Sequence, residues 1–186
     1  SNDPSSPTFI NTNFVRNHAN GGSAIYTRGD PITETAICTV INSIIWGNID
    51  EVASSLSPII FNRTLLGEPS FTVISYSIIQ SGYDAGTDVS DPNNKFNVDP
   101  FFYLLPPSAP SAIGNFHVVP FSPAIDMGDN TANTYPQDMD ANDRIVNGTI
   151  DIGTYEYAEV PIDCNLYTGM TSLYVDSAAN GDNNGT

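Results

Sequence analysis

The sequence predicts an all-β fold of the solenoid type, a right-handed parallel β-helix whose C-terminal turns end in a cap. Three observations predict this class. Short β-branched segments recur along the chain, Asn- and Gly-rich turns separate them, and no stretch has the hydrophobic period of an amphipathic helix. Each turn of such a coil buries its apolar residues against the next turn, because one turn alone has too little core to be stable.

The repeat emerges when three apolar segments are aligned. Phe14, Ile45 and Ile79 take equivalent places in them, at spacings of 31 and 34 residues. The three segments read TFINTNFVRN, TVINSIIWGN and TVISYSIIQS, at residues 8–17, 39–48 and 72–81. They are too short and too β-branched for the helix pairs of ankyrin or tetratricopeptide arrays, which have similar periods. We therefore predict that the three aligned residues stack on one another inside the coil.

Matching asparagines mark the turns between these segments. Asn17 and Asn48 occupy equivalent places in the first two repeats. Asparagines stacked at a corner can hydrogen-bond from turn to turn and satisfy backbone groups that would otherwise be buried without a partner. We predict such an amide ladder for this pair.

The repeat breaks at residues 82–99, which read GYDAGTDVSDPNNKFNVD and contain several turn signals. We interpret this segment as a polar insertion. The side of the coil that carries this insertion is then the exposed face that we expect to contact a partner.

Composition restricts the partners. Five Lys and Arg stand against 21 Asp and Glu, for a formal charge of −16. Nucleic acid is excluded because neutralising phosphates needs clustered cations, and an anionic membrane surface is disfavoured for the same reason. No apolar run approaches the roughly 20 residues of a membrane span, so membrane contact is expected only through an anchor elsewhere in a longer chain.

The C-terminal stretch 122–157 contains the strongest charge constellation. It holds one cation, Arg144, among several aspartates. We predict that Arg144 pairs with Asp126 or Asp151 and ties the cap loop to the last strands, since an arginine–carboxylate pair has a fixed bidentate geometry.

A calcium site is the alternative for the same loop, and Ca²⁺ is the one cofactor that the sequence suggests. The candidate ligands are Asp138, Asp140, Asp143 and Asp129. Calcium takes about six to eight oxygen ligands, which carboxylates and carbonyls could supply here, although the Gly and final Glu of an EF-hand loop are missing.

Trp46, at a corner in the sequence IIWGN, is a candidate carbohydrate contact because aromatic rings stack on sugars. Packing beneath a loop is the alternative role for this side chain.

A series of motifs resembles known families. FVRNHANGGSAIY, at residues 14–26, resembles the repeats of polymorphic outer-membrane proteins. Further motifs resemble the C-terminal half of secreted bacterial pectate-lyase-like β-helix proteins, which often carry a choice-of-anchor C-terminus. In chain order these motifs read NSIIWGN, SYSIIQSG, NVDPFF, SPAIDMGDN and DIGTYEY. LYVDSAANGDNNGT, near the end, resembles the opening of another such β-helix.

The resemblance implies a chain of three parts. Residues 1–157 would form the last turns and cap of one β-helix, 158–170 a linker, and 171–186 the start of a following module. Pectate lyases need an Arg or Lys base beside calcium held by aspartates. Here Arg16, Arg28 and Arg63 lack an aligned Asp cluster, so the resemblance does not extend to the catalytic residues.

The function implied is a structural or adhesive segment of a large exported protein, at the surface of a bacterium with an outer membrane or outside the cell, with no catalytic activity of its own. Two alternatives remain open. The chain could be part of a polysaccharide lyase or glycoside hydrolase whose active site lies on other turns, or a glycan-binding module. The partners expected are a polysaccharide or another surface or secretion protein.

Overall fold

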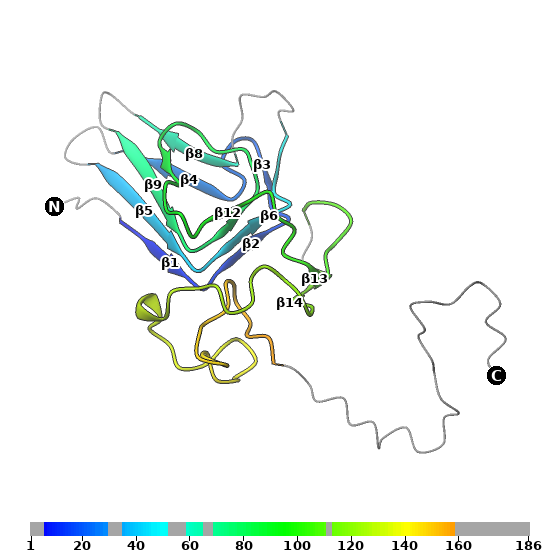
Figure 1. Ribbon diagram of the computed structural model, residues 1–186. Helices are drawn as coiled ribbons and strands as arrows, with labels where there is room; N and C mark the ends of the chain where they lie inside the picture. Colours follow the sequence, from blue (N-terminus) through cyan, green and yellow to red (C-terminus); the bar gives the residue numbers. More distant parts are fainter. Residues whose placement is uncertain (1–5, 30–34, 52–58, 65–68, 111–112, 159–186) are drawn as a thin grey trace, which may run out of the picture.

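The computed structural model describes residues 6–29, 35–51, 59–64, 69–110 and 113–158. Within these ranges the fold is all-β, and its strand pairs are parallel except for one hairpin (Figure 1). No helix formed by these residues is long and apolar enough to cross a membrane. The predicted following module at 171–186, and the predicted linker from residue 159 onward, lie outside the described residues.

Two four-stranded parallel sheets form the centre of the fold. The first sheet consists of β1 (Thr8–Ile10), β5 (Ala36–Ile41), β9 (Ser70–Ser75) and β11 (Thr87–Asp88). The second sheet consists of β2 (Asn13–Val15), β6 (Ile44–Trp46), β10 (Ile78–Ile79) and β12 (Lys95–Phe96). Each strand of the first sheet leads to its counterpart in the second, and the two sheets meet in a V (Figure 1).

Smaller elements complete the fold. Two parallel pairs extend the repeats and are formed by β3 (His18–Ala19) with β7 (Ile49–Asp50) and by β4 (Ile25–Arg28) with β8 (Ile60–Arg63). The C-terminal part contains an antiparallel hairpin of β13 (Phe102–Leu104) and β14 (Asn115–Val118), and a 3-10 turn, η1 (Asn130–Ala132).

Strands from successive repeats are neighbours in the second sheet. Ile45 of β6 lies between Phe14 of β2 and Ile79 of β10, so the predicted alignment of these three residues is confirmed. Pairs in the first sheet have the same spacings of 31 and 34 residues. The chain therefore passes once along each sheet in every repeat.

Tight corners join the two sheets. Asn11, Asn42 and Tyr76 occupy the corners after β1, β5 and β9, with φ of 54°, 51° and 47°. Such left-handed backbone is easiest for glycine and asparagine, which explains why two of these corners carry Asn.

A polar ladder runs through the residues that follow these corners. The backbone N–H of Thr12 donates to Oγ of Ser43, and the N–H of Ser43 donates to Oγ of Ser77, both at 3.1 Å. The N–H of Ser77 donates in turn to Oδ1 of Asn94 at 3.0 Å. We call the strands formed by one pass of the chain along both sheets a level. A side-chain oxygen of each level thus accepts a hydrogen bond from a backbone N–H of the level before it.

The interpretation of residues 82–99 as an insertion is wrong. Their strands β11 and β12 continue the two sheets, with the spacing shortened to 15 residues in the first sheet and 17 in the second. The polar residues serve this shorter level: Asn94 extends the corner ladder, and the Asp84 carboxylate accepts hydrogen bonds from the backbone and side-chain N–H groups of Asn62.

Apolar clusters lie on both faces of the second sheet. Ile45 and Ile79 belong to the cluster between the strands of the repeats, together with Ile25, Cys38, Val40, Ile59, Ile60 and Ile74. Ile44 and Ile78 point to the opposite face, because successive side chains of a strand alternate. There they contact Val118, Ala124 and Ile152. Burial on both faces explains why these strands read as unbroken apolar runs.

The segment 122–157 was expected to close the end of the coil. Instead it lies along the flank, beneath the corner of the V (Figure 1). The physical reason is the outward-facing Ile44 and Ile78, which need an apolar cover. The backbone N–H of Gly153 donates to the carbonyl of Asn42 at 2.8 Å, which fixes this cover to the corner. We call it the flank cover (residues 122–157).

Candidate functional site

A buried arginine organises the flank cover. Arg144 is 2% exposed, and its Nη2 donates to the backbone carbonyl oxygens of Asp151, at 3.4 Å, and of Gly153. Its Nε lies 3.5 Å from Oε1 of Glu156, whose side chain is also buried. Arg144 thus ties the loop at 138–144 to the segment that contacts the corner.

The carboxylate partner of Arg144 differs from the expected one. The carboxyl group nearest to the guanidinium is that of Glu156, whereas Asp151 offers Arg144 its carbonyl. The Asp151 carboxylate accepts instead from the backbone N–H groups of Asp126, at 2.7 Å, and Tyr157, at 2.6 Å. Asp126 and Asp151, the two alternative partners considered for Arg144, therefore contact each other, and the sequence of a loop gives no indication of which of its side chains turns inward.

Burial governs the charges in this cluster. Burial, reinforced by the neighbouring Asp151 carboxylate, raises the pKa of Glu156 to about 8. Burial also raises the pKa of Asp151, and it lowers the pKa of Arg144 against the opposing effect of the nearby carboxylates. The cluster therefore favours a protonated Glu156 at neutral pH.

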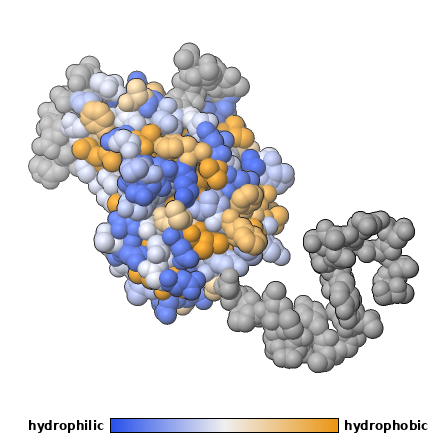
Figure 2. All heavy atoms as spheres, viewed as in Figure 1, coloured by the Kyte–Doolittle hydropathy of each residue, from blue (hydrophilic) through white to orange (hydrophobic). Residues whose placement is uncertain are grey.

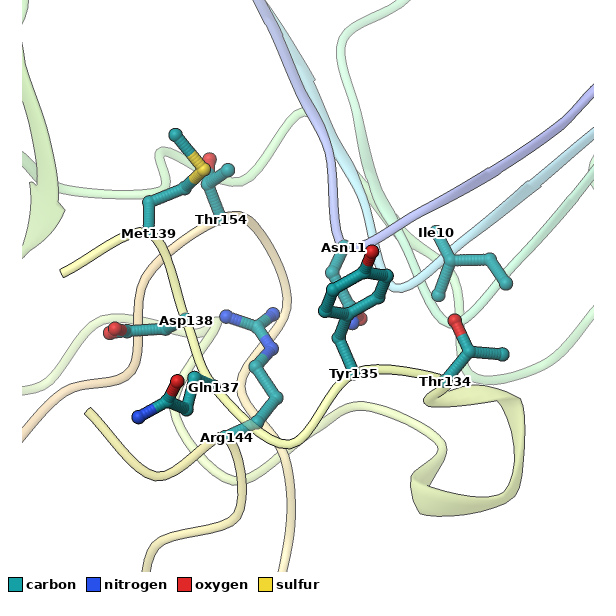
Figure 3. A pocket seen from close by; sticks show the side chains of 9 residues that line it. All are labelled: Ile10, Asn11, Thr134, Tyr135, Gln137, Asp138, Met139, Arg144 and Thr154. Carbon is teal, nitrogen blue, oxygen red and sulfur yellow. The ribbon is translucent and has the colours of Figure 1, made fainter. Parts of the chain in front are cut away.

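A pocket of about 360 Å³ separates this cluster from the first corner. Figure 3 shows the Arg144 guanidinium between Asp138 and Tyr135, with Asn11 behind the tyrosine ring. Tyr135 and Met139 are largely exposed at its rim. The pocket could admit a small polar molecule, but three side-chain atoms of its lining that lack a hydrogen-bond partner, Nε and Nη1 of Arg144 and Oδ1 of Asn11, are themselves buried.

The aspartates considered as calcium ligands have separate roles. Within the described ranges, no group of three or more His, Cys, Asp or Glu side chains is arranged to hold a metal ion. The Asp138 carboxylate accepts hydrogen bonds from the backbone of Asp140, Asn142 and Glu156. Although partial burial opposes the change, these bonds lower the pKa of Asp138.

The remaining candidate ligands take part in other contacts. Asp129 caps η1 by accepting from the N–H of Thr131 at 2.9 Å. Asp143 forms a backbone bridge with Gln137. Asp140 lies 2.6 Å from Nε2 of His117.

This last contact joins the flank cover to the hairpin. The His117 ring stacks on Tyr155 with 3.9 Å between ring centroids. Its Nδ1 faces Oδ1 of Asn115, and its Nε2 faces Asp140, so the ring donates to both acceptors when it is an imidazolium. This contact could not be derived from the sequence, because His117 and Asp140 are 23 residues apart and no repeat relates them.

The predicted asparagine ladder is present. Oδ1 of Asn48 accepts from the backbone N–H and the side-chain amide of Asn17, at 2.9 and 3.0 Å. Asn48 donates onward to the carbonyl of Phe14 at 2.7 Å.

Trp46 is half-buried and packs against the apolar cluster beneath the flank cover. This corresponds to the packing role that the sequence left open beside sugar contact.

Comparison of the chain with protein-family models, with curated proteins and with solved structures finds no significant match. The functional conclusion therefore depends on the geometry of the described residues and on the sequence motifs.

Proposed function

We propose that the chain is a segment of a right-handed parallel β-helix with a structural and adhesive role. In this proposal it forms a stiff part of a large exported protein, at the surface of a bacterium with an outer membrane, and has no catalytic activity of its own. The finer description of the fold, a continuous right-handed coil, belongs to the same proposal.

The observation that carries the proposal is the stacking of successive levels in two sheets at once. In both sheets, strands of adjacent levels pair in parallel and in the same order. Side-chain ladders at two corners link the levels as well. Such an array gains nearest-neighbour contacts at every level, so it suits a long, rigid spacer.

Surface character supports the adhesive part. Exposed apolar side chains gather beside the β13–β14 hairpin, where Figure 2 shows a hydrophobic patch. Phe101, Tyr103 and Leu104 are 49%, 71% and 53% exposed there. Contiguous apolar patches on a protein surface often mark interaction sites, whereas single exposed apolar residues are common and need no explanation.

Antibodies raised against the folded 186-residue chain test the location. Intact cells that make the protein should be labelled as strongly as permeabilised cells. Labelling that requires permeabilisation would contradict export to the surface.

Beads coated with the chain test adhesion, with beads coated with heat-unfolded chain as the matched control. The folded chain should retain the beads on bacterial or host polysaccharide surfaces. Equal retention of both bead types would contradict the adhesive role. Release of unsaturated product from acidic polysaccharides, followed by ultraviolet absorbance, would instead favour the lyase alternative.

A further inference from the structure

Two arginines and two aromatic residues share the outward face of the β4–β8 pair. In the parallel register, Tyr26 lies beside Phe61 and Arg28 beside Arg63. Tyr26 and both arginines are exposed and Phe61 is half-exposed, whereas the alternate residue Thr27 is buried on the other face. We call these four residues the arginine–aromatic strip.

The two arginines stand side by side on neighbouring strands. Neighbouring strands are about 4.8 Å apart, and like charges placed opposite one another destabilise a sheet. Among the described residues, neither Arg28 nor Arg63 has a carboxylate within 4.0 Å. In a chain with five cations and 21 acidic residues, this alignment creates a local site where an external anion would relieve repulsion.

The aromatic residues adjoin the charged end of the strip. The rings of Tyr26 and Phe61 meet edge to face, with 5.6 Å between centroids and 71° between planes. Nη1 of Arg63 donates to the Tyr26 hydroxyl at 3.4 Å. An apolar ring surface and two guanidinium groups are therefore available to one ligand, and Tyr26 is 47% exposed.

We propose that the arginine–aromatic strip binds a sugar carrying a sulfate or phosphate ester. Such an ester presents three terminal oxygens, enough to accept hydrogen bonds from both guanidinium groups, whereas the two oxygens of a carboxylate match a single guanidinium. The apolar face of the sugar ring packs on Tyr26 and Phe61. Nucleic acid fits poorly, because two cations neutralise too few phosphates.

This inference rests on the proposed adhesive role, for which it supplies the ligand class. The strip lies on one of the parallel pairs, β4–β8, away from the flank cover and its pocket. Variants on it should therefore leave the fold intact.

Amide chemical-shift titrations of the 186-residue chain at low ionic strength test the proposal. The probes are glucose 6-sulfate, glucose 6-phosphate, glucuronate and glucose. Both esters should shift the amide signals of Tyr26 and Arg63, and the tighter of the two identifies the source of the ligand. Glucuronate and glucose should bind about tenfold more weakly or not at all.

Arg28→Gln and Arg63→Gln should each weaken ester binding by about tenfold, because each removes charge-assisted hydrogen bonds. Lys95→Gln is the matched control, since it makes the same change in net charge from a half-buried position on β12. It should leave the affinity within about twofold.

Equal binding of glucuronate and the esters would overturn the inference, as would equal losses in Arg28→Gln and Lys95→Gln. Either result would leave the bead-retention test of the adhesive role and the surface-labelling test of location unaffected. Conversely, a chain that binds the esters but is absent from the cell surface would refute the location alone.

Discussion

Replacing Glu156 by Gln should change how the stability of the chain depends on pH. Glu156 is 5% exposed, and burial raises its pKa from 4.5 to about 8. Between these two values the folded chain holds a proton that the unfolded chain has released. This contribution to stability is therefore fully present below pH 4.5 and is lost as the pH rises through about 8.

The size of the effect follows from the pKa difference. One pKa unit corresponds to about 1.4 kcal/mol, so the full shift sets an upper limit of about 5 kcal/mol. Arg144, at 3.5 Å, and the backbone N–H of Asp151, at 3.0 Å, both favour the ionised form. Both effects are already included in the pKa of about 8, so we expect a loss of about 4 kcal/mol between pH 5 and pH 9 in the wild-type chain.

Urea unfolding measured across this pH range provides the assay. The single tryptophan, Trp46, packs against the apolar cluster beneath the flank cover, so its fluorescence reports on this region. Glu156→Gln should show a flatter profile and be more stable than the wild type at pH 9. If the free energies of unfolding of the wild type and of Glu156→Gln changed in parallel from pH 5 to pH 9, the reasoning would be refuted. Burial also raises the pKa of Asp151, so a residual slope of the same sign should remain in the variant.

Three further predictions concern the core, the ladder and metals. Ile45→Ala should cost about 2–5 kcal/mol in urea unfolding through the cavity it leaves, and Ile37→Ala, on the exposed face of β5, less than about 1 kcal/mol. Equal costs would contradict the assignment of faces. Asn48→Ala should cost about 1–3 kcal/mol, because it leaves the backbone N–H of Asn17 and the carbonyl of Phe14 without their side-chain partner, and Asn17→Ala should cost less. The reverse order would argue against the ladder. A chelator should leave the melting temperature unchanged, and a rise on adding calcium would revive the metal site.

The sequence alone predicted the parts of the fold that repeat. The column of Phe14, Ile45 and Ile79, and the contact of Asn17 with Asn48, follow from regular spacing. Regular spacing is informative because in-register parallel strands place equivalent residues side by side.

Parts that depend on irregular connections could not be predicted. The short level at 82–99 has about half the usual spacing, so its turn-forming Asp and Asn residues resembled a loop. One signal was usable. A strand with one face in water alternates apolar and polar residues, so the consecutive isoleucines at 44–45 and 78–79 indicate that both faces of this sheet are buried.

The candidate sites were the hardest to derive. Arg144 stood out as the one cation of its segment, but its partner Glu156 and its carbonyl contacts depend on how a loop folds back. Arg28 and Arg63 lie 35 residues apart, a spacing that differs from the 31 and 34 of the main repeat. Their pairing emerges only from the strand register.

Methyl–methyl nuclear Overhauser effects in a chain with labelled isoleucines test the stacking of repeats most directly. Ile45 and Ile79 are neighbours on adjacent strands, about 5 Å apart, and both point into the same cluster. The account predicts a strong cross-peak between their δ1 methyl groups, and a second between Ile44 and Ile78 on the opposite face. Assigned methyl groups that show neither cross-peak would contradict it.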